Sequence, residues 1–264
     1  MELRGSHALI TGGSAGLGVE FAKQLHRLGV TVTLVARRAE QLESLCRDLN
    51  AVQSGSATAL TADLTDGAAV QKIIDYIRGR RIDILINNAG RGSFGHFENL
   101  NIDDEIQEVT LNVTATLRLA HAVIPQMKAR RTGAIVSVSS IAAFQPIPYM
   151  ATYCSTKAFN LMHSMALRHE LSDFGVRVVT VCPGPTQTEF NGVARVPGTP
   201  TGMERDSADE VVAEAIRALR SNRPFVVTGW RSKLMSLGSR FAPKEFSTWL
   251  TKKMLASSLR SKTP

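Results

Sequence analysis

Tyr153 and Lys157 are the two side chains whose types and spacing most directly suggest catalytic chemistry. They lie four residues apart in a segment with helical periodicity, which puts both on one helix face about 6 Å apart. An ammonium group at that distance stabilises a phenolate and lowers the phenol pKa from its usual value of about 10. We therefore expect a tyrosine that donates a proton to a ketone oxygen or removes one from an alcohol.

A glycine-rich segment, Thr11-Gly12-Gly13-Ser14-Ala15-Gly16-Leu17-Gly18, joins the first expected strand to the first expected helix. Glycines at such a junction let the backbone turn tightly and approach a diphosphate. The helix N-terminus supplies unpaired N–H groups and the positive end of a dipole. A plain glycine-rich turn is the alternative, but the position between strand and helix favours a dinucleotide-binding loop.

Short β-branched runs alternate with longer amphipathic stretches, which predicts a βα repeat. The expected strands are His7–Thr11, Val30–Ala36, Ala57–Ala62, Ile82–Ile86, Ala134–Val138, Val176–Cys182 and Phe225–Thr228. Helices are expected over 17–28, 38–50, 66–79, 103–129, 152–173 and 207–221. Parallel strands need helical crossovers on both faces. The expected fold class is therefore α/β, a single doubly wound domain with a seven-stranded parallel sheet sandwiched by helices.

The composition is that of a globular protein: of 264 residues, 44% are hydrophobic and 20% are charged. The three cysteines, Cys46, Cys154 and Cys182, form no C-x-x-C pair, which argues against a disulfide framework and favours a reducing, cytoplasmic location. No apolar run approaches the ~18 residues of a membrane span, and the first residues lack a signal-peptide core. The histidines lack ligand spacing, so no metal site is expected.

The formal charge of +8 is concentrated near the C-terminus. Residues 231–264 hold eight Lys and Arg but one acidic residue, whereas residues 1–230 are nearly neutral. Nucleic-acid binding would need a groove-reading motif, and none is found, so no nucleic-acid partner is expected. We therefore divide the chain into a catalytic domain over 1–230 and a basic, amphipathic extension over 231–264.

Three further segments occur in an order typical of one family: Asn87-Asn88-Ala89-Gly90 after the fourth strand, Tyr153-Cys154-Ser155-Thr156-Lys157 opening a helix, and Pro183-Gly184 after the sixth strand. With the Thr-Gly-x-x-x-Gly-x-Gly segment, they make residues 5–190 resemble the short-chain dehydrogenase/reductase family. The resemblance implies a Rossmann-like fold and an oxidoreductase that transfers hydride between a nicotinamide cofactor and a ketone or secondary alcohol.

The resemblance implies a catalytic set of Asn112, Ser140, Tyr153 and Lys157. Ser140 lies thirteen residues before the tyrosine, as in the family, and would bond the reacting oxygen. The adjacent Ser139 competes for this role, but it points to the opposite face of the strand. By the same resemblance, Asn112 would hold a water that links Lys157 to solvent. Cys154 is interpreted as a buried thiol, because no base is placed to activate it.

Arg37 and Arg38 stand at the end of the second strand, where an NAD-dependent enzyme would carry an acidic residue. A guanidinium there binds a 2′-phosphate, so NADP(H) is the expected cofactor. A solvated arginine pair is the alternative, but arginine at a helix N-terminus opposes the dipole. With contacts implied by the resemblance, the expected cofactor-binding residues are Gly12, Ser14, Ala15, Gly16, Leu17, Gly18, Arg37, Arg38, Asp63, Leu64, Asn88, Ala89, Gly90, Tyr153, Lys157, Pro183, Gly184, Thr186 and Thr188.

The segment between the catalytic serine and tyrosine is expected to form the substrate wall, together with a flexible flap over about 188–206 that is rich in Gly and Pro. Tyr149 belongs to this wall, because Tyr153 occupies the position where an activating lysine would be needed. Such an apolar lining suits a bulky ketone or secondary alcohol. The expected substrate-binding residues are Ser140, Gln145, Ile147, Tyr149, Tyr153 and Phe190, with Phe144 and Val193 as further lining.

The predicted helices over 103–129 and 152–173 carry more apolar surface than one sheet face covers, which together with the resemblance implies a homodimer or homotetramer. The apolar stripe over 245–259 has two interpretations: docking on this protein, which we favour, or peripheral contact with a membrane. Two other functions are a catalytically idle NADP(H)-binding regulatory protein and a membrane-surface protein that acts through the basic tail. The complete catalytic set argues against the first.

Overall fold

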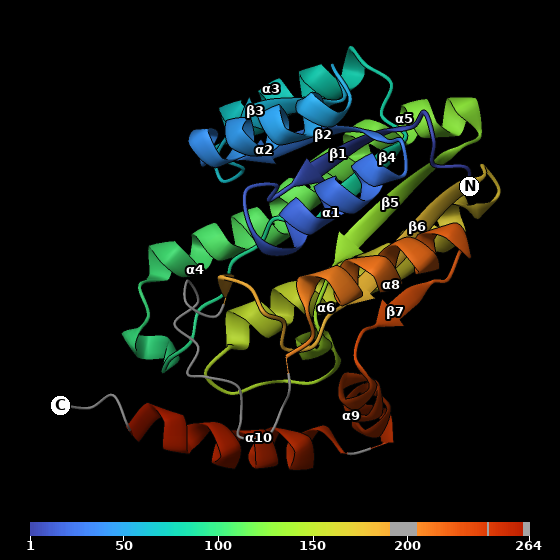
Figure 1. Cartoon of the computed structure of the whole chain (residues 1–264). Coiled ribbons are helices and arrows are strands. Elements are labelled where there is room, and N and C mark those ends of the chain that lie inside the picture. Colours follow the sequence, from blue (N-terminus) through green and yellow to red (C-terminus); the bar gives the residue numbers. More distant parts are fainter. Residues whose placement is uncertain (191–204, 242, 261–264) are drawn as a thin grey trace.

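A computed structural model describes residues 1–190, 205–241 and 243–260 (Figure 1). Its centre is a seven-stranded sheet in the order β3-β2-β1-β4-β5-β6-β7, in which all neighbouring strands are parallel, as the sequence predicts. The strands are β1 (His7–Thr11), β2 (Thr31–Ala36), β3 (Ala57–Thr61), β4 (Ile84–Asn87), β5 (Gly133–Val138), β6 (Val176–Cys182) and β7 (Phe225–Val227). The strand order reverses between β1 and β4, the place where ligands bind in open α/β sheets.

Helices cover both faces of the sheet because consecutive strand residues point to opposite sides. In β1, Ala8 and Ile10 pack with α1 (Gly16–Arg27), α2 (Ala39–Val52) and α8 (Ala208–Arg220). Leu9 faces the other layer, which consists of α3 (Gly67–Arg78), α5 (Thr116–Arg130) and α6 (Ala151–Ser172). The result is the predicted three-layer architecture with two apolar cores.

The helix predicted over 103–129 is interrupted. It consists of α4 (Ile102–Val109), a π-helical segment η2 (Thr110–Ala115) and α5. A π turn holds one more residue than an α turn, so the side-chain phase changes where Asn112 lies. The predicted strand Ile82–Ile86 is observed as Ile84–Asn87. Short 3-10 helices, η1 (Phe97–Asn99) and η3 (Ile141–Phe144), follow β4 and β5.

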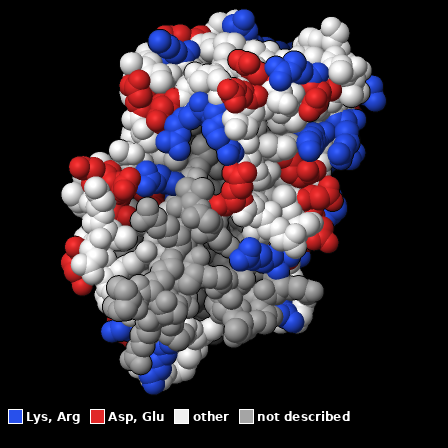
Figure 2. All heavy atoms as spheres, turned by 60° about the vertical axis from the view of Figure 1, so that its left-hand side comes forward, with Lys and Arg blue, Asp and Glu red and all other residues white. Residues whose placement is uncertain are grey.

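The C-terminal extension contains α9 (Trp230–Phe241) and α10 (Lys244–Arg260). The apolar stripe of α10 is not buried by this chain, because Phe246, Trp249, Leu250 and Met254 are 44–56% exposed. Among the helices that are described, none is long and apolar enough to cross a bilayer. Lys and Arg are interspersed with Asp and Glu over the described part of the face in Figure 2. Most of the predicted flap, residues 191–204, lies outside the described residues.

Candidate active site

Thr11 joins the glycine-rich loop to the end of β4. Its hydroxyl donates to the Ile86 carbonyl (3.2 Å) and accepts from the N–H groups of Asn88 and Ala89 (both 3.0 Å). The Asn88 side chain donates back to the Thr11 carbonyl at 2.8 Å. The loop after β1 and the loop after β4 are therefore held together at the point where the strand order reverses.

Gly12 needs both its small size and its conformation. Its φ is +69°, and a Cβ there would lie 2.7 Å from the Asn88 amide nitrogen. The next turn opens α1, whose N-terminus has no capping side chain because Ala15 occupies that position. A Cβ on Gly16 would meet the Thr188 methyl group at 3.1 Å, so Thr188, a predicted cofactor-binding residue, lies beside this turn. The N–H groups at the start of α1 have no capping side chain, and the glycines leave the loop backbone accessible to a ligand. Both features fit the diphosphate of a nicotinamide dinucleotide.

Arg38 folds over the glycine-rich loop. Its guanidinium donates to the Ser14 hydroxyl (3.1 Å) and carbonyl (2.8 Å) and pairs with Glu189 at 3.0 Å. Arg37 is more exposed and lies 3.8 Å from Asp63. Burial raises the pKa of Asp63, but hydrogen bonds from Thr65 and the Arg37 charge outweigh it and lower the pKa overall.

Further predicted cofactor residues lie after β3 and after β6. Leu64 is buried in the core under α3, so its side chain points away from the loops. After β6, the Pro183 carbonyl accepts from Ile141 N–H at 3.0 Å, and the Thr186 hydroxyl donates to the Gly184 carbonyl at 2.9 Å. The hydroxyl of Thr186 thus has a partner within its own loop.

Asn112 is fully buried in the π-helical segment and holds three groups in place. Its amide nitrogen donates to the Arg91 carbonyl (2.9 Å) and the Thr156 hydroxyl (3.0 Å), and its oxygen accepts from Arg91 N–H (3.0 Å). Thr156 lies on α6 between Tyr153 and Lys157. Asn112 therefore ties the loop after β4 to the helix that carries the predicted catalytic pair, Tyr153 and Lys157.

Tyr153 and Lys157 lie at the start of α6 and are both buried. The Lys157 ammonium lies 5.7 Å from the Tyr153 ring centroid and donates to the Val138 carbonyl at 3.0 Å. A Cβ on Gly90 would come within 3.2 Å of Lys157 Nζ, so the residue at 90 must be small. The predicted proximity of phenol and ammonium is present.

The predicted effect of this proximity on the phenol is wrong. Burial raises the pKa of Tyr153 above its ordinary value, although the hydrogen bond with Ser140 acts to lower it. Burial also lowers the pKa of Lys157 to about 8. Because the phenolate would be poorly solvated here, Tyr153 stays a phenol at neutral pH.

The structure separates the two candidate serines. The buried Ser139 hydroxyl donates to the Lys157 carbonyl at 2.7 Å and so holds the backbone of α6. Ser140 caps η3, accepting from Ala142 N–H at 3.1 Å, and its hydroxyl also interacts with Tyr153. Ser140, which the family spacing of thirteen residues selects, is therefore the serine that interacts with the tyrosine.

An apolar cluster surrounds the Tyr153 ring. Phe190 lies 5.3 Å from it between ring centroids, and Phe94, Ile147 and Met150 complete the cluster. Tyr149 contacts Phe94 and His96 at centroid distances of 6.1 Å and 5.1 Å. Ile147 and Phe190 thus lie where the sequence predicts.

Other predicted wall residues lie elsewhere. Phe144 packs against Phe225 with 6.5 Å between ring centroids, in a separate cluster with Leu161, because η3 turns its side chain towards β7. Gln145 is half-buried at the end of η3. Val193 lies outside the described residues. Cys154 is buried, and burial raises the pKa of its thiol to about 12, consistent with the predicted inert thiol.

Sequence reasoning misses residues on the loop after β4 and on α4. A Cβ on Gly92 would lie 2.9 Å from the Tyr153 ring and 3.0 Å from Phe190. The glycines at 90 and 92 in the sequence Gly-Arg-Gly are the available signal for a close backbone approach.

Among the described residues, no three His, Cys, Asp or Glu side chains are grouped to hold a metal ion.

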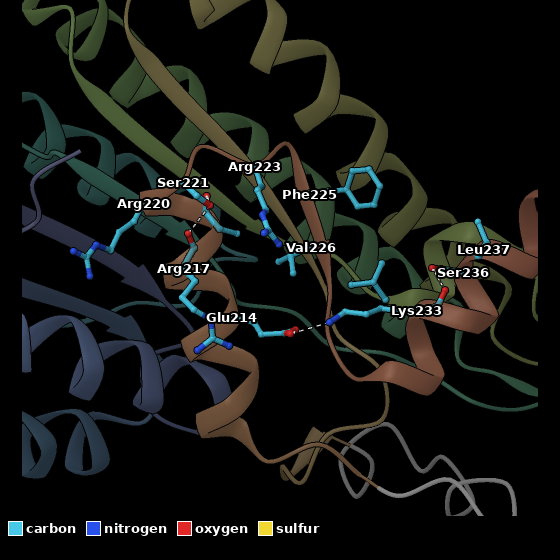
Figure 3. A pocket seen from close by; sticks show the side chains of 12 residues that line it. Glu214, Arg217, Arg220, Ser221, Arg223, Phe225, Val226, Lys233, Ser236 and Leu237 are labelled. Atoms are coloured by element: carbon cyan, nitrogen blue, oxygen red, sulfur yellow. Dashed lines mark hydrogen bonds and ion pairs between the residues drawn. The ribbon is translucent and has the colours of Figure 1, made fainter.

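A hollow of about 910 Å³ lies between α8, β7 and α9 (Figure 3). Arg217, Arg220 and Arg223 line it, and Lys233 bridges to Glu214 at 2.9 Å across its side. None of the predicted catalytic residues lines this hollow. The predicted catalytic residues lie instead on α6, on η2 and just after β5.

The sequence pattern of the family described as short chain dehydrogenase matches residues 6–196. The chain belongs to the short-chain dehydrogenase family. A very-long-chain 3-oxoacyl-CoA reductase from Neurospora crassa is 37% identical over 238 residues, which are 87% of this chain and 70% of that protein. Hydroxysteroid dehydrogenase-like protein 1 from Gallus gallus is 32% identical, and the match spans 81% of this chain but 66% of that relative.

Solved structures of the short-chain dehydrogenase family agree with the fold. A short-chain dehydrogenase from Sphingobium yanoikuyae in complex with NADPH has a TM-score of 0.82 and 33% identity, covering 98% of this chain and 96% of that one. A bulky-bulky ketone specific alcohol dehydrogenase from Comamonas testosteroni has a TM-score of 0.77 and 28% identity, covering 98% and 95%. Family membership makes this chain an oxidoreductase that uses a nicotinamide cofactor.

The different partners of the two serines generate a prediction. Ser140→Ala should lower turnover on the order of 100-fold, because the hydroxyl beside Tyr153 is lost, with little change in stability. Ser139→Ala should lower the free energy of unfolding by about 1 kcal/mol, because the Lys157 carbonyl loses a buried donor, with a much smaller effect on turnover. Steady-state kinetics and urea unfolding of both variants measure this, and the reverse pattern would contradict the assignment.

Proposed function

We propose that this protein is an NADP(H)-dependent oxidoreductase that interconverts a bulky, largely apolar ketone and the corresponding secondary alcohol, with Tyr153 as the general acid/base. The observation that carries the proposal is the convergence of three groups. The Tyr153 phenol interacts with Ser140 at the end of β5, lies near the Lys157 ammonium, and is bordered by the apolar cluster around Phe190.

The cofactor, when bound, supplies or accepts the hydride at the carbonyl carbon. The glycine-rich loop, the N-terminus of α1, Arg38 and Thr188 would hold it. In the direction of reduction, the Ser140 hydroxyl donates a hydrogen bond to the carbonyl oxygen of the substrate and fixes its position beside the phenol. Tyr153 donates its proton to this oxygen as negative charge develops there. The phenol is protonated at neutral pH, as the role of proton donor requires.

The apolar cluster supports a bulky substrate. Phe94, Ile147, Met150 and Phe190 present apolar surface beside the phenol, and Tyr149 extends it towards His96. The names of two relatives point the same way: one acts on bulky-bulky ketones and the other on very-long-chain 3-oxoacyl-CoA. Both substrate classes have a carbonyl flanked by large groups.

The role of Tyr153 leads to the most direct prediction. Tyr153→Phe removes the transferable proton but keeps the ring, so NADPH should bind with nearly unchanged Kd while ketone reduction falls at least ~100-fold. Tyr149→Phe is the matched control and should keep most of the rate. Fluorescence titration with NADPH and turnover of a panel of bulky ketones measure both quantities. Near-normal turnover by Tyr153→Phe, or NADPH binding without turnover by the wild type, would contradict the proposal.

Arg37 and Arg38 support the preference for NADP(H). Arg38 already lies against Ser14 of the glycine-rich loop, and Arg37 adds positive charge beside it. We expect wild-type kcat/KM to be higher with NADPH than with NADH. The double substitution Arg37→Asp, Arg38→Ile should reverse the order by removing attraction to the 2′-phosphate and adding repulsion. Arg47→Asp, on the exposed side of α2, is the control for charge reversal away from the glycine-rich loop; a wild-type preference for NADH would refute the assignment.

A homodimer or homotetramer is part of the proposal, together with a reducing, cytoplasmic location. Exposed apolar side chains on α4 and α6, including Ile102, Ile106 and Met162 at 56–62% exposure, support a subunit contact. The location is supported by three cysteines that are all buried and free.

Light scattering at micromolar protein should therefore give a dimer or tetramer mass, and Ile106→Glu combined with Met162→Glu should reduce it, because charge cannot be buried there. A monomeric wild type would contradict this. Deletion of residues 243–264 tests the role of α10. A smaller number of subunits supports docking within the oligomer. An unchanged number of subunits with lost binding to anionic vesicles supports membrane contact.

A further inference from the structure

Glu108 is a buried carboxylate on α4, a helix that packs against α6. It lies near the end of α4, is completely inaccessible to solvent, and neither of its side-chain oxygens has a hydrogen-bond partner. A buried carboxylate without partners costs free energy, because the charged form loses its hydration. The packing of α4 does not explain why a carboxylate is buried at this position.

The groups that face Glu108 come from three elements. From the loop after β4, Arg91 and the Ser93 hydroxyl approach it and lower its pKa, although Ser93 makes no hydrogen bond of normal geometry with it. From α4 itself, the buried Glu105 adds a like charge. From α6, which packs against α4, Lys157 contributes a positive charge. Burial dominates, and the pKa of Glu108 is raised to about 7.

The interaction with Lys157 is mutual. Burial lowers the pKa of Lys157 to about 8, and Glu108 is the carboxylate that raises it, with a smaller effect from Cys182. The ammonium donates to the Val138 carbonyl, which is a neutral acceptor. Glu108 also acts on the neighbouring Tyr153 and Cys154 on the same helix. Among the described residues, Glu108 is thus the carboxylate placed to compensate the buried ammonium.

We propose that Glu108 is a positioning residue of the active site: its buried carboxylate keeps Lys157 in the charged ammonium form beneath Tyr153. This inference rests on the proposed function for its effect on the reaction but not for the charge coupling itself. Removing the carboxylate leaves Lys157 without a compensating charge, so Lys157 should lose its proton at lower pH. The role of Glu108 is electrostatic, and it does not touch the reacting atoms.

The coupling is tested first without any substrate. The pKa of Lys157 is measured by NMR from the lysine ¹³Cε resonance, assigned by comparison with Lys157→Met. In Glu108→Gln, which keeps the shape of the side chain, the Lys157 pKa should fall by on the order of one unit. Glu108→Asp should restore part of the shift. An unchanged Lys157 pKa in Glu108→Gln would overturn the inference, whether or not the protein reduces ketones.

The effect on the reaction is tested by the pH dependence of kcat/KM for reduction of a bulky ketone with NADPH. In Glu108→Gln, the alkaline fall in activity should begin at lower pH, following Lys157. Glu105→Gln is the control: it removes the same charge from the same cluster but relieves the repulsion on Glu108, so the alkaline fall should stay or move upward. A downward move in Glu105→Gln, or none in Glu108→Gln, would contradict the role of Glu108.

Stability distinguishes this role from a structural one. Because the Glu108 pKa is raised from 4.5 to about 7 in the folded chain, its contribution to stability is present below pH 4.5 and is lost as the pH rises through about 7. At pH 8, Glu108→Gln should therefore unfold at the same or a higher temperature than the wild type. A large loss of thermal stability would instead assign Glu108 a packing role.

Discussion

The buried ammonium of Lys157 is the constraint around which the site is organised. A lysine that is 4% exposed loses most of its hydration, and this loss has to be offset by fixed partners. The Val138 carbonyl at the end of β5 accepts from the ammonium, and Ser139 holds the backbone of the same residue. Gly90 leaves room for the Lys157 side chain. In the role proposed above, the Glu108 carboxylate provides the opposite charge.

The same set of contacts brings the catalytic side chains together from distant parts of the chain. Ser140 follows β5 as the N-cap of η3, α6 supplies Tyr153, and the π-helical segment supplies Asn112, which hydrogen-bonds both α6 and the loop after β4. Thr11 then connects that loop to the glycine-rich turn of β1. Side chains that transfer a proton and backbone groups that suit a diphosphate therefore sit at neighbouring strand ends, as hydride transfer with proton transfer requires.

Much of this arrangement could be predicted from the sequence. The four-residue spacing of Tyr153 and Lys157 fixes their common helix face, and strand alternation separates Ser140 from Ser139. The periodicity of apolar residues predicts the strands and the two helical layers. These features depend on local geometry, which a short segment determines by itself.

Other features depend on contacts between distant segments. The apolar pattern of the predicted helix over 103–129 continues through the π turn at Asn112. The local sequence therefore contains no signal for this turn. Phe144 turns towards Phe225 because of the path of η3, and Glu108 is buried although a charged residue in an amphipathic helix is usually solvated. The pKa of Tyr153 moves opposite to the sequence-based prediction because burial outweighs the hydrogen bond with Ser140.

In the proposed site, a nicotinamide cofactor reaches Tyr153 from the carboxyl ends of the strands. A crystal structure of Tyr153→Phe with NADPH and a bulky ketone tests it most directly. The account predicts density for the diphosphate at the N-terminus of α1, for the 2′-phosphate beside Arg38, and for the ketone oxygen beside Ser140. Ordered NADPH in the hollow between α8, β7 and α9, with none against the glycine-rich loop, would contradict it.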